Sequence, residues 1–285
     1  MDDRIRQVST PAVSATRSLF GREAFFSLGA LLLSALLVQV IYATVIRPRA
    51  EAILAEPPTS QEKLQPGRPV THNLRSIWVI LKDYEQETAI TLAVWALCLI
   101  GYQARAVALN RRLLDKQYIE LEEGHVILPD DARAFGRPIE RLPRDEQDML
   151  LPRALMVALN RFGATRSVQD SAEAVRAECE NELDRLDAQL SMVRFTAWAI
   201  PAVGFVGTVR GIGRALQEAQ GALHGDISGV TLGLGVTFNA TLTALVSCIF
   251  VMFCLHQLQQ AQDRLVLDAR SYIDRRLIRN MRVHK

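Results

Sequence analysis

The sequence predicts an all-α integral membrane protein with four transmembrane helices and long helical extensions on the cytoplasmic side. Of its 285 residues, 49% are hydrophobic, and they gather in separate runs. Four of these runs have the length of about 17–25 residues that a helix needs to cross a bilayer. They are Ala24–Ile46, Ala89–Ala108, Met192–Val209 and Val230–Leu255. The first run is long for a signal peptide, and no clear cleavage site follows it.

The distribution of Lys and Arg predicts which loops face the cytoplasm, where positive residues are favoured. Residues 217–229 contain neither, whereas Asn110–Leu190 and the tail after Leu255 are rich in both. We therefore place 217–229 outside and both chain termini in the cytoplasm. The loop after the first run is placed outside as well, although it carries Arg47 and Arg49 beside the membrane, against the rule.

The chain thus divides into five regions. These are a cytoplasmic tail (1–23), transmembrane helices 1 and 2 with an outer loop at 47–87 (24–109), a cytoplasmic helical domain (110–190), transmembrane helices 3 and 4 (191–258) and a cytoplasmic helical tail (259–285). Apolar residues recur at helical steps from Val175 to Val193, and Leu258, Leu265 and Tyr272 lie seven apart. We expect these two extensions to pack together.

No motif for catalysis or metal binding is recognisable in the sequence. The four cysteines lack metal-ligand spacing and an oxidising environment, so we predict no disulfide and no metal site. Gly211-Ile212-Gly213 is too short for a phosphate-binding loop. We expect no enzyme activity, no cofactor and no nucleic-acid partner.

The third run carries glycines on one helix face. Gly204, Gly207 and Gly211 lie three and four residues apart, and small residues on one face let two helices approach closely. The fourth run offers Gly229, Gly233 and Ala240 in return. Pro201 removes a backbone hydrogen bond and predicts a kink. On packing alone this pattern indicates only a helix–helix contact.

Hydroxyl side chains accompany the small residues and favour more than packing. Thr208 neighbours the glycine face, and Thr237 and Thr241 lie four apart on the fourth run. Thr231, Asn239 and Thr243 make that run more polar. A single Thr in a membrane helix usually bonds its own backbone, whereas several with an Asn favour a wet path or a partner contact.

Carboxylates are missing from all four runs. Thr and Asn do not titrate near neutral pH. We therefore expect any proton-carrying group within the membrane to come from another chain.

The stretch PAVGFVGTVRGI at 201–212, with the Thr-bearing fourth run, resembles the MotA/TolQ/ExbB proton-channel family, which reads P-x-x-G-[LF]-[LF]-G-T-V-x-G-I at this place. The resemblance covers about 170–260, and the four spans are similar to the layout of MotA. It implies a homopentamer in the bacterial inner membrane around a dimer of a single-span partner resembling MotB, TolR or ExbD. The partner's Asp would carry protons. Thr208 and Thr241 fall on the family's pathway threonines, and Thr237 and Asn239 are further candidates.

The sequence departs from the family pattern at several positions. Val236 stands near where many relatives carry a Glu, and Asn239 stands where one branch has Asp. Arg210 replaces an apolar residue or Trp, and Arg214 follows one turn later. An arginine at mid-membrane would cost about 2.5–3.5 kcal/mol, so we place both at the outer mouth. There they influence cation access, anchor the partner or simply extend to the interface.

The leading hypothesis is the channel-forming subunit of a membrane motor driven by the proton-motive force. A non-conducting scaffold of the same architecture is the alternative, which the missing acids would fit. A solute transporter is less favoured because repeated halves are lacking. The process that is driven, and the choice between protons and Na⁺, stay open.

Overall fold

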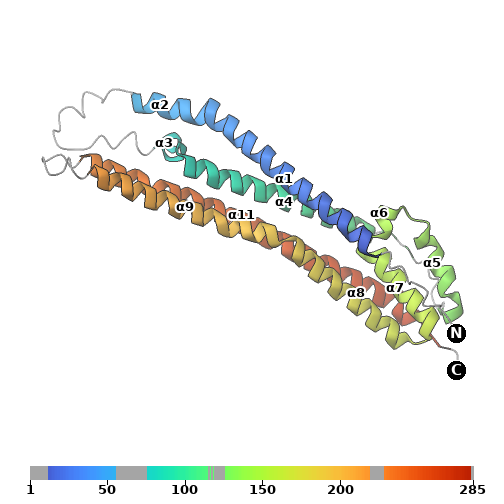
Figure 1. Ribbon diagram of the computed structural model, residues 1–285. Coiled ribbons are helices and arrows are strands. Elements are labelled where there is room, and N and C mark those ends of the chain that lie inside the picture. Colours follow the sequence, from blue (N-terminus) through green and yellow to red (C-terminus); the bar gives the residue numbers. More distant parts are fainter. Residues whose placement is uncertain are drawn as a thin grey trace, which may run out of the picture. The chain divides into compact units, whose positions relative to one another are not determined.

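The computed structural model describes residues 12–55, 76–114, 116, 118, 126–218 and 228–283, with side chains from Phe25 onward. Within these residues the chain is helical, apart from turns and an isolated bridge between Ile127 and Met281. The elements are α1 (Ala12–Ile41), the π-helix η1 (Tyr42–Ile46), α2 (Arg47–Ala55), α3 (Ile77–Leu81), α4 (Tyr84–Leu114), η4 (Pro129–Asp131), α5 (Ala132–Glu140), α6 (Arg144–Gln147), α7 (Leu150–Thr165), α8 (Val168–Gln189), α9 (Ser191–Gln217), α11 (Ser228–Arg276) and η5 (Ile278–Asn280) (Figure 1).

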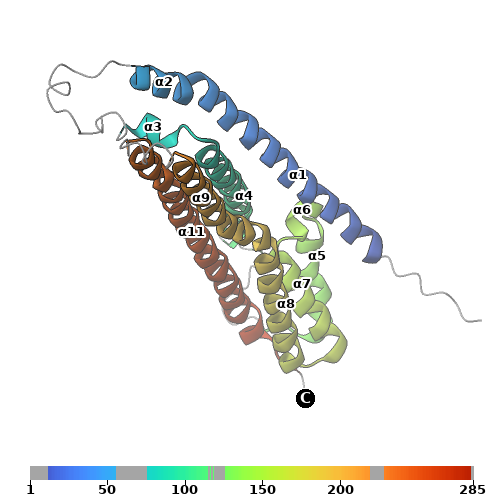
Figure 2. The ribbon, with the colours of Figure 1, turned by 60° about the vertical axis from the view of Figure 1, so that its left-hand side comes forward.

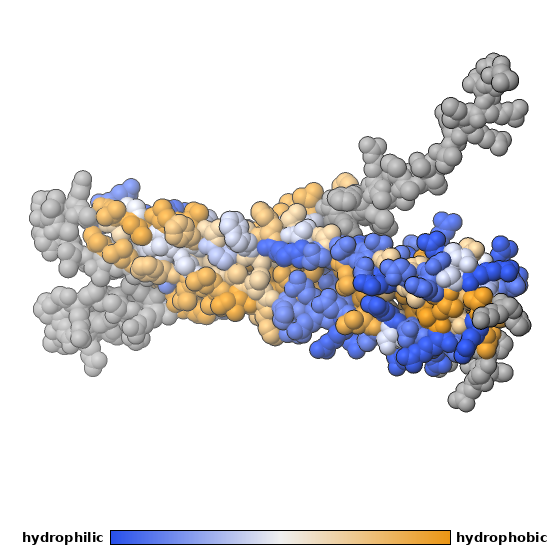
Figure 3. Space-filling view, turned by 90° about the horizontal axis from the view of Figure 1, so that it is seen from below, coloured by the Kyte–Doolittle hydropathy of each residue, from blue (hydrophilic) through white to orange (hydrophobic). Residues whose placement is uncertain are grey.

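Four helical stretches among the described residues are long and apolar enough to cross a membrane, as the sequence predicts. They are Phe25–Ala55, Tyr84–Leu114, Val168–Gln217 and Thr237–Asn280. The chain divides into two compact units. The first unit comprises 1–99 and 196–251, and the second comprises 100–195 and 252–285. On the face seen in Figure 3, apolar side chains gather on the first unit and charged ones on the second.

Helices extend further than expected at both ends of the first span. α1 begins at Ala12, inside the segment predicted as a tail (1–23), because its sequence from there on contains no proline. Beyond the span the helix continues through η1 and α2 to Ala55, inside the predicted loop. The π-helical turn precedes Pro48, whose ring has no N–H to donate to the turn before it.

In the first unit, α1 packs on α4 through a few polar contacts and an apolar cluster. Trp95 donates its indole N–H to the carbonyl oxygen of Ser27 at 2.9 Å. Val38, Tyr42 and Ile46 are buried against side chains of α3 and α4. α4 also begins earlier than the apolar run, at Tyr84 instead of Ala89, and this places Glu85, Gln86, Glu87 and Thr88 at the start of the second span.

The second unit has a conventional apolar core. Large side chains of α7, including Leu155 and Phe162, are buried with Val175 of α8 and Ile273 of α11. The predicted association of the two helical extensions is therefore observed, with α7 packed against α8 as well. Ser167 caps the start of α8, since its hydroxyl accepts a hydrogen bond from the backbone N–H of Asp170 at 3.2 Å.

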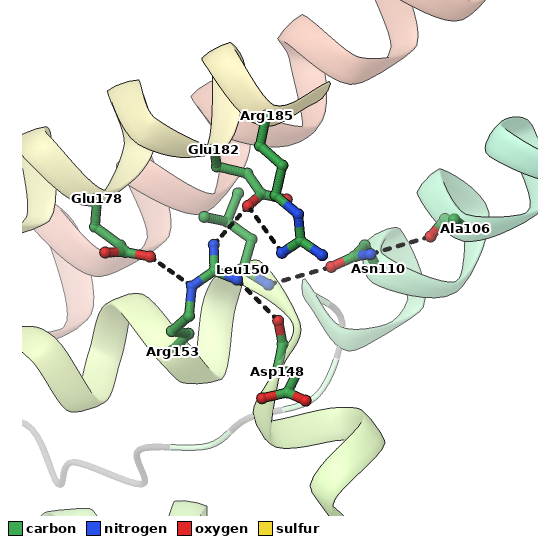
Figure 4. Close-up of polar contacts among 8 residues, drawn as sticks. All are labelled: Ala106, Asn110, Asp148, Leu150, Arg153, Glu178, Glu182 and Arg185. Atoms are coloured by element: carbon green, nitrogen blue, oxygen red, sulfur yellow. Dashed lines mark hydrogen bonds and ion pairs between the residues drawn. The ribbon is translucent and has the colours of Figure 1, made fainter. Parts of the chain in front are cut away.

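An arginine joins α7 to α8 at the edge of this core (Figure 4). Arg153 donates to Glu178 and to Glu182, each at 2.5 Å. Burial disfavours the Arg153 cation, but the hydrogen bonds and charges of the two carboxylates outweigh burial and raise the pKa of Arg153. The same view shows Asn110 accepting from the backbone N–H of Leu150 at 3.3 Å.

Candidate functional site

The candidate site lies in the first unit, where α9 and α11 run side by side (Figures 1 and 2). Two glycines of α9 meet alanines of α11. A Cβ placed on Gly204 would lie 2.6 Å from the Cβ of Ala244, and one on Gly207 would lie 2.6 Å from the Cβ of Ala240. Only a glycine fits such a close approach.

The row of glycines continues one turn further. Gly211 faces the Thr237 side chain so closely that a Cβ there would overlap it. Thr237 is 4% exposed. Gly229, Gly233 and Val236 belong to the part of α11 whose side chains lie outside the description.

Two predicted pathway residues come together within this contact. The hydroxyls of Thr208 and Thr241 are in direct hydrogen-bond contact across the helix pair. Both also lie near one backbone oxygen, that of Gly204, at 3.3 Å from Thr208 and 2.9 Å from Thr241. Each hydroxyl has a single proton to donate. One hydroxyl therefore donates to the other, which donates to the carbonyl, and the order can reverse.

The remaining candidates occupy different positions. Asn239 is half-buried, but at about 100° per residue it projects from α11 on the side away from Thr237 and Thr241. The structure does not bring Asn239 to the contact with α9. Pro201 is half-buried within α9, which stays helical through it from Ser191 to Gln217.

Arg210 has an intramolecular partner that the sequence did not suggest. Its guanidinium binds the Glu85 carboxylate of α4 through two contacts, Nε to Oε1 at 2.6 Å and Nη2 to Oε2 at 2.7 Å. The Glu85 side chain is 10% exposed and that of Arg210 is 41% exposed. Arg210 therefore has a partner within the chain, and the roles expected for it at the outer mouth stay predictions. A signal was available, since Glu85 stands only four residues before the second apolar run.

A second ion pair lies beside the first. Glu87, two residues further along α4, binds Arg47 of α2 at 2.5 Å. The Arg47 guanidinium also stacks on the ring of Tyr84, with 4.6 Å to the ring centroid. Two acid–arginine pairs thus connect the start of α4 with α2 and α9.

A small cavity of about 110 Å³ opens where α4, α9 and α11 meet. Its lining includes Glu85, Gln86, Arg210, Arg214 and Thr237. Gly207 and Gly211 form part of the same wall. The cavity therefore adjoins the row of small residues that leads to the Thr208–Thr241 contact.

Residues 146–271 match the model of the MotA/TolQ/ExbB proton channel family. This part of the chain belongs to that family. The match includes α7, α8, α9 and most of α11, and with them both pathway threonines, whereas Glu85 and the rest of α4 lie before it. A search of curated proteins and a search of solved structures found no match.

The family match and the four apolar helices make the chain a multi-pass membrane subunit of the proton-channel type. The MotA/TolQ/ExbB match was expected from 201–212 and the Thr-bearing fourth run, and it is confirmed. Within the described residues, no group of three or more His, Cys, Asp or Glu side chains is placed to hold a metal ion.

Proposed function

We propose that the chain is the channel-forming subunit of a membrane motor driven by the proton-motive force. Five copies surround a dimer of a single-span partner of the MotB, TolR or ExbD kind in the bacterial inner membrane. The partner supplies an Asp that carries protons, or Na⁺ in their place. Both chain termini lie in the cytoplasm. Each proton that crosses about 100 mV releases about 2.3 kcal/mol, enough for a few protons to drive a mechanical step.

The Thr208–Thr241 contact is the observation that carries this proposal. A hydroxyl pair that shares one carbonyl oxygen can pass a hydrogen bond from one partner to the other without separating charge. The same hydroxyls can accept a bond from a protonated carboxyl group or coordinate Na⁺. An imported Asp next to this pair would find the polar contacts that the surrounding apolar helices lack.

The composition of α9 and α11 supports an imported acid. Neither helix contains Asp or Glu from Ser191 to Gln217 or from Ser228 to Gln262. A carboxylate within the membrane is expensive unless it is functional or paired. A chain that lines a proton path without such a group depends on a partner for it.

The outer faces of the same helices support an assembly. Large apolar side chains are exposed on both, including Phe205 and Val209 of α9 and Leu242, Val246 and Ile249 of α11. Lipid and neighbouring copies of the chain would cover such faces in the membrane.

Proton flux through vesicles that hold the chain with its single-span partner tests the proposal. We expect Thr208→Ala with Thr241→Ala to lower the flux about tenfold or more, which corresponds to a barrier higher by about 1.4 kcal/mol. Thr44→Ala is the matched control, because the Thr44 hydroxyl bonds only the backbone of its own helix, at Val40, with a distance of 2.7 Å. It should conduct like the unchanged chain.

Three outcomes would contradict the proposal. Unchanged flux in the double threonine variant would remove the threonines from the path. A correctly assembled complex that conducts no ions would favour the non-conducting scaffold. A chain that stays monomeric or dimeric in mild detergent would exclude the pentamer.

A further inference from the structure

The cavity at the start of α4 combines charged, polar and small residues from three helices. α4 contributes Glu85 and Gln86, α9 contributes Arg210 and Arg214, and α11 contributes Thr237. Among these helices, α4 lies outside the family match at 146–271. The cavity is therefore a feature that the family assignment does not explain.

Gln86 indicates what fills the cavity. Its side chain is fully buried, and its amide N–H donates to the carbonyl oxygen of Ile80 at 2.8 Å. Its Oε1 atom has no hydrogen-bond donor among the described residues. A buried polar atom left without a partner costs about 1–3 kcal/mol. The cavity of about 110 Å³ has room for a few water molecules at about 30 Å³ each, and one of them would satisfy this oxygen.

The cavity lies next to the threonine contact. Gly207, in its wall, immediately precedes Thr208 in α9. Thr237, also in its wall, is one helical turn from Thr241 in α11. Water in the cavity is thus about one turn of each helix away from the paired hydroxyls.

We propose that this cavity is the hydrated outer entrance of the ion path, and that Glu85 is the carboxylate that draws the cation into it. The cation is a hydronium ion or Na⁺, both of which prefer oxygen ligands of the kind that Glu85, Gln86 and Thr237 supply. This inference rests on the proposed function and on its orientation in the membrane.

Arg210 sets the charge of this entrance. Its two contacts with Glu85 hold the carboxylate at the mouth and offset its negative charge. Asp83 and Arg214 are the other charged groups of the lining. The neighbouring Glu87 and Arg47 neutralise each other at 2.5 Å and are not part of the wall.

Opposite effects of the two partners follow from this arrangement. Removing Glu85 leaves two arginines and one Asp at the mouth, and the excess positive charge repels cations. Removing Arg210 leaves an excess of negative charge, which attracts them. If the ion pair served only to hold α4 against α9, removing Glu85 and removing Arg210 would lower the cation flux by the same factor.

The test measures cation flux of the assembled complex in vesicles, with a proton gradient in one arm and a Na⁺ gradient in the other. We expect Glu85→Gln to lower flux about tenfold at low ionic strength, the lower end of electrostatic steering effects. We expect Arg210→Gln to leave flux unchanged or raise it. Both differences should shrink at 1 M salt, where charges are screened beyond about 3 Å. The arm that responds identifies the cation.

Glu87→Gln is the matched control, because it removes a carboxylate two residues away that has its own arginine and does not line the cavity. It should stay within about twofold of the unchanged chain, a difference below about 0.5 kcal/mol. If Glu85→Gln does not assemble, the double variant Glu85→Gln with Arg210→Gln replaces the ion pair by two amides, and its flux should fall below that of Arg210→Gln alone.

Equal losses from Glu85→Gln and Arg210→Gln, or an equal loss from Glu87→Gln, would overturn the inference. So would flux in Glu85→Gln that matches the unchanged complex, while the proposed function would stand. An unchanged complex that does not conduct would instead overturn the proposed function itself.

Discussion

Two helix pairs in this chain are held together by opposite means. Between α9 and α11, glycines meet alanines at close approach, and the polar link is a pair of threonine hydroxyls. Between α7 and α8, large apolar side chains fill a core, and at its edge the Arg153 guanidinium binds the carboxylates of two glutamates. The first pair suits lipid, which offers helices no hydrophobic drive to associate, so that close packing must hold them. The second suits water, where burial of apolar surface dominates.

The comparison also shows where charge is tolerated. In the second unit, α8 and the end of α11 carry both carboxylates and arginines, and α7 carries two arginines. Residues 195–209 of α9 and 228–262 of α11 contain no Asp, Glu, Lys or Arg, and an acid beside their contact comes from α4, as Glu85. Charge is therefore confined to the ends of the membrane pair, where it can control access without blocking the contact itself.

The largest effect is expected at the charged link. Arg153→Met should lower the free energy of unfolding by about 3 kcal/mol, the lower end of the range for breaking a buried ion pair, because Glu178 and Glu182 keep their charges but lose their main partner. Both carboxylates are mostly buried, at 20% and 12% exposure. Thermal unfolding of the whole chain in detergent, followed by circular dichroism, would measure the loss.

Arg176→Met provides the control for this variant. Arg176 pairs with Glu180 one turn away on the same exposed face of α8, at 2.9 Å. Exposed pairs of this kind contribute little. If both variants unfold at the same temperature as the unchanged chain, the link between α7 and α8 is apolar and the comparison fails.

A smaller loss is expected at the close contact of the membrane pair. Gly204→Ala would place a methyl group 2.6 Å from Ala244 and 3.1 Å from the backbone of Thr241, which cannot move aside. Overpacking of this kind costs about 1–3 kcal/mol, and we expect about 2 kcal/mol. Unfolding of the assembled complex by increasing denaturing detergent would report it.

Gly213→Ala on the same helix separates packing from helix propensity. A Cβ at Gly213 has no neighbour within 4 Å. Alanine favours a helix over glycine by about 0.5–1 kcal/mol, so this variant should be neutral or slightly more stable. Equal destabilisation by the two substitutions would mean that glycine at 204 is not needed for close approach.

The sequence predicted the membrane pair well because its signals are local. Glycines three and four residues apart define a face without knowledge of the partner, and Thr208 and Thr241 stand at fixed steps from that face. The four spans follow from the length and hydropathy of the four apolar runs. Each of these features depends on residues within a few turns of one another.

The outer entrance could not be predicted in the same way. Glu85 and Arg210 are 125 residues apart, and nothing local to either indicates the other. A search for acids inside the apolar runs also passes over Glu85, because the run begins at Ala89 while the helix begins at Tyr84. Asn239 lies on another face of α11 than Thr237 and Thr241, and the polarity of a membrane helix does not by itself indicate which face carries it; its role in the ion path stays a prediction.

The smallest expected effect lies at the turn between α7 and α8. The Ser167 hydroxyl satisfies the N–H of Asp170, one of the unpaired donors of the first turn of α8. Ser167→Ala should therefore lower the free energy of unfolding by about 1 kcal/mol.

The residue before Ser167, Arg166, has a φ of 52°, which glycine adopts more readily than other residues. Arg166→Gly should raise the free energy of unfolding, and an unfolding temperature above that of the unchanged chain would show that the backbone at Arg166 is strained. If Ser167→Ala unfolded at the same temperature as the unchanged chain, the α7–α8 contact would depend on Arg153 and the apolar core alone. The two helix pairs would then differ only in how their contacts are packed and charged.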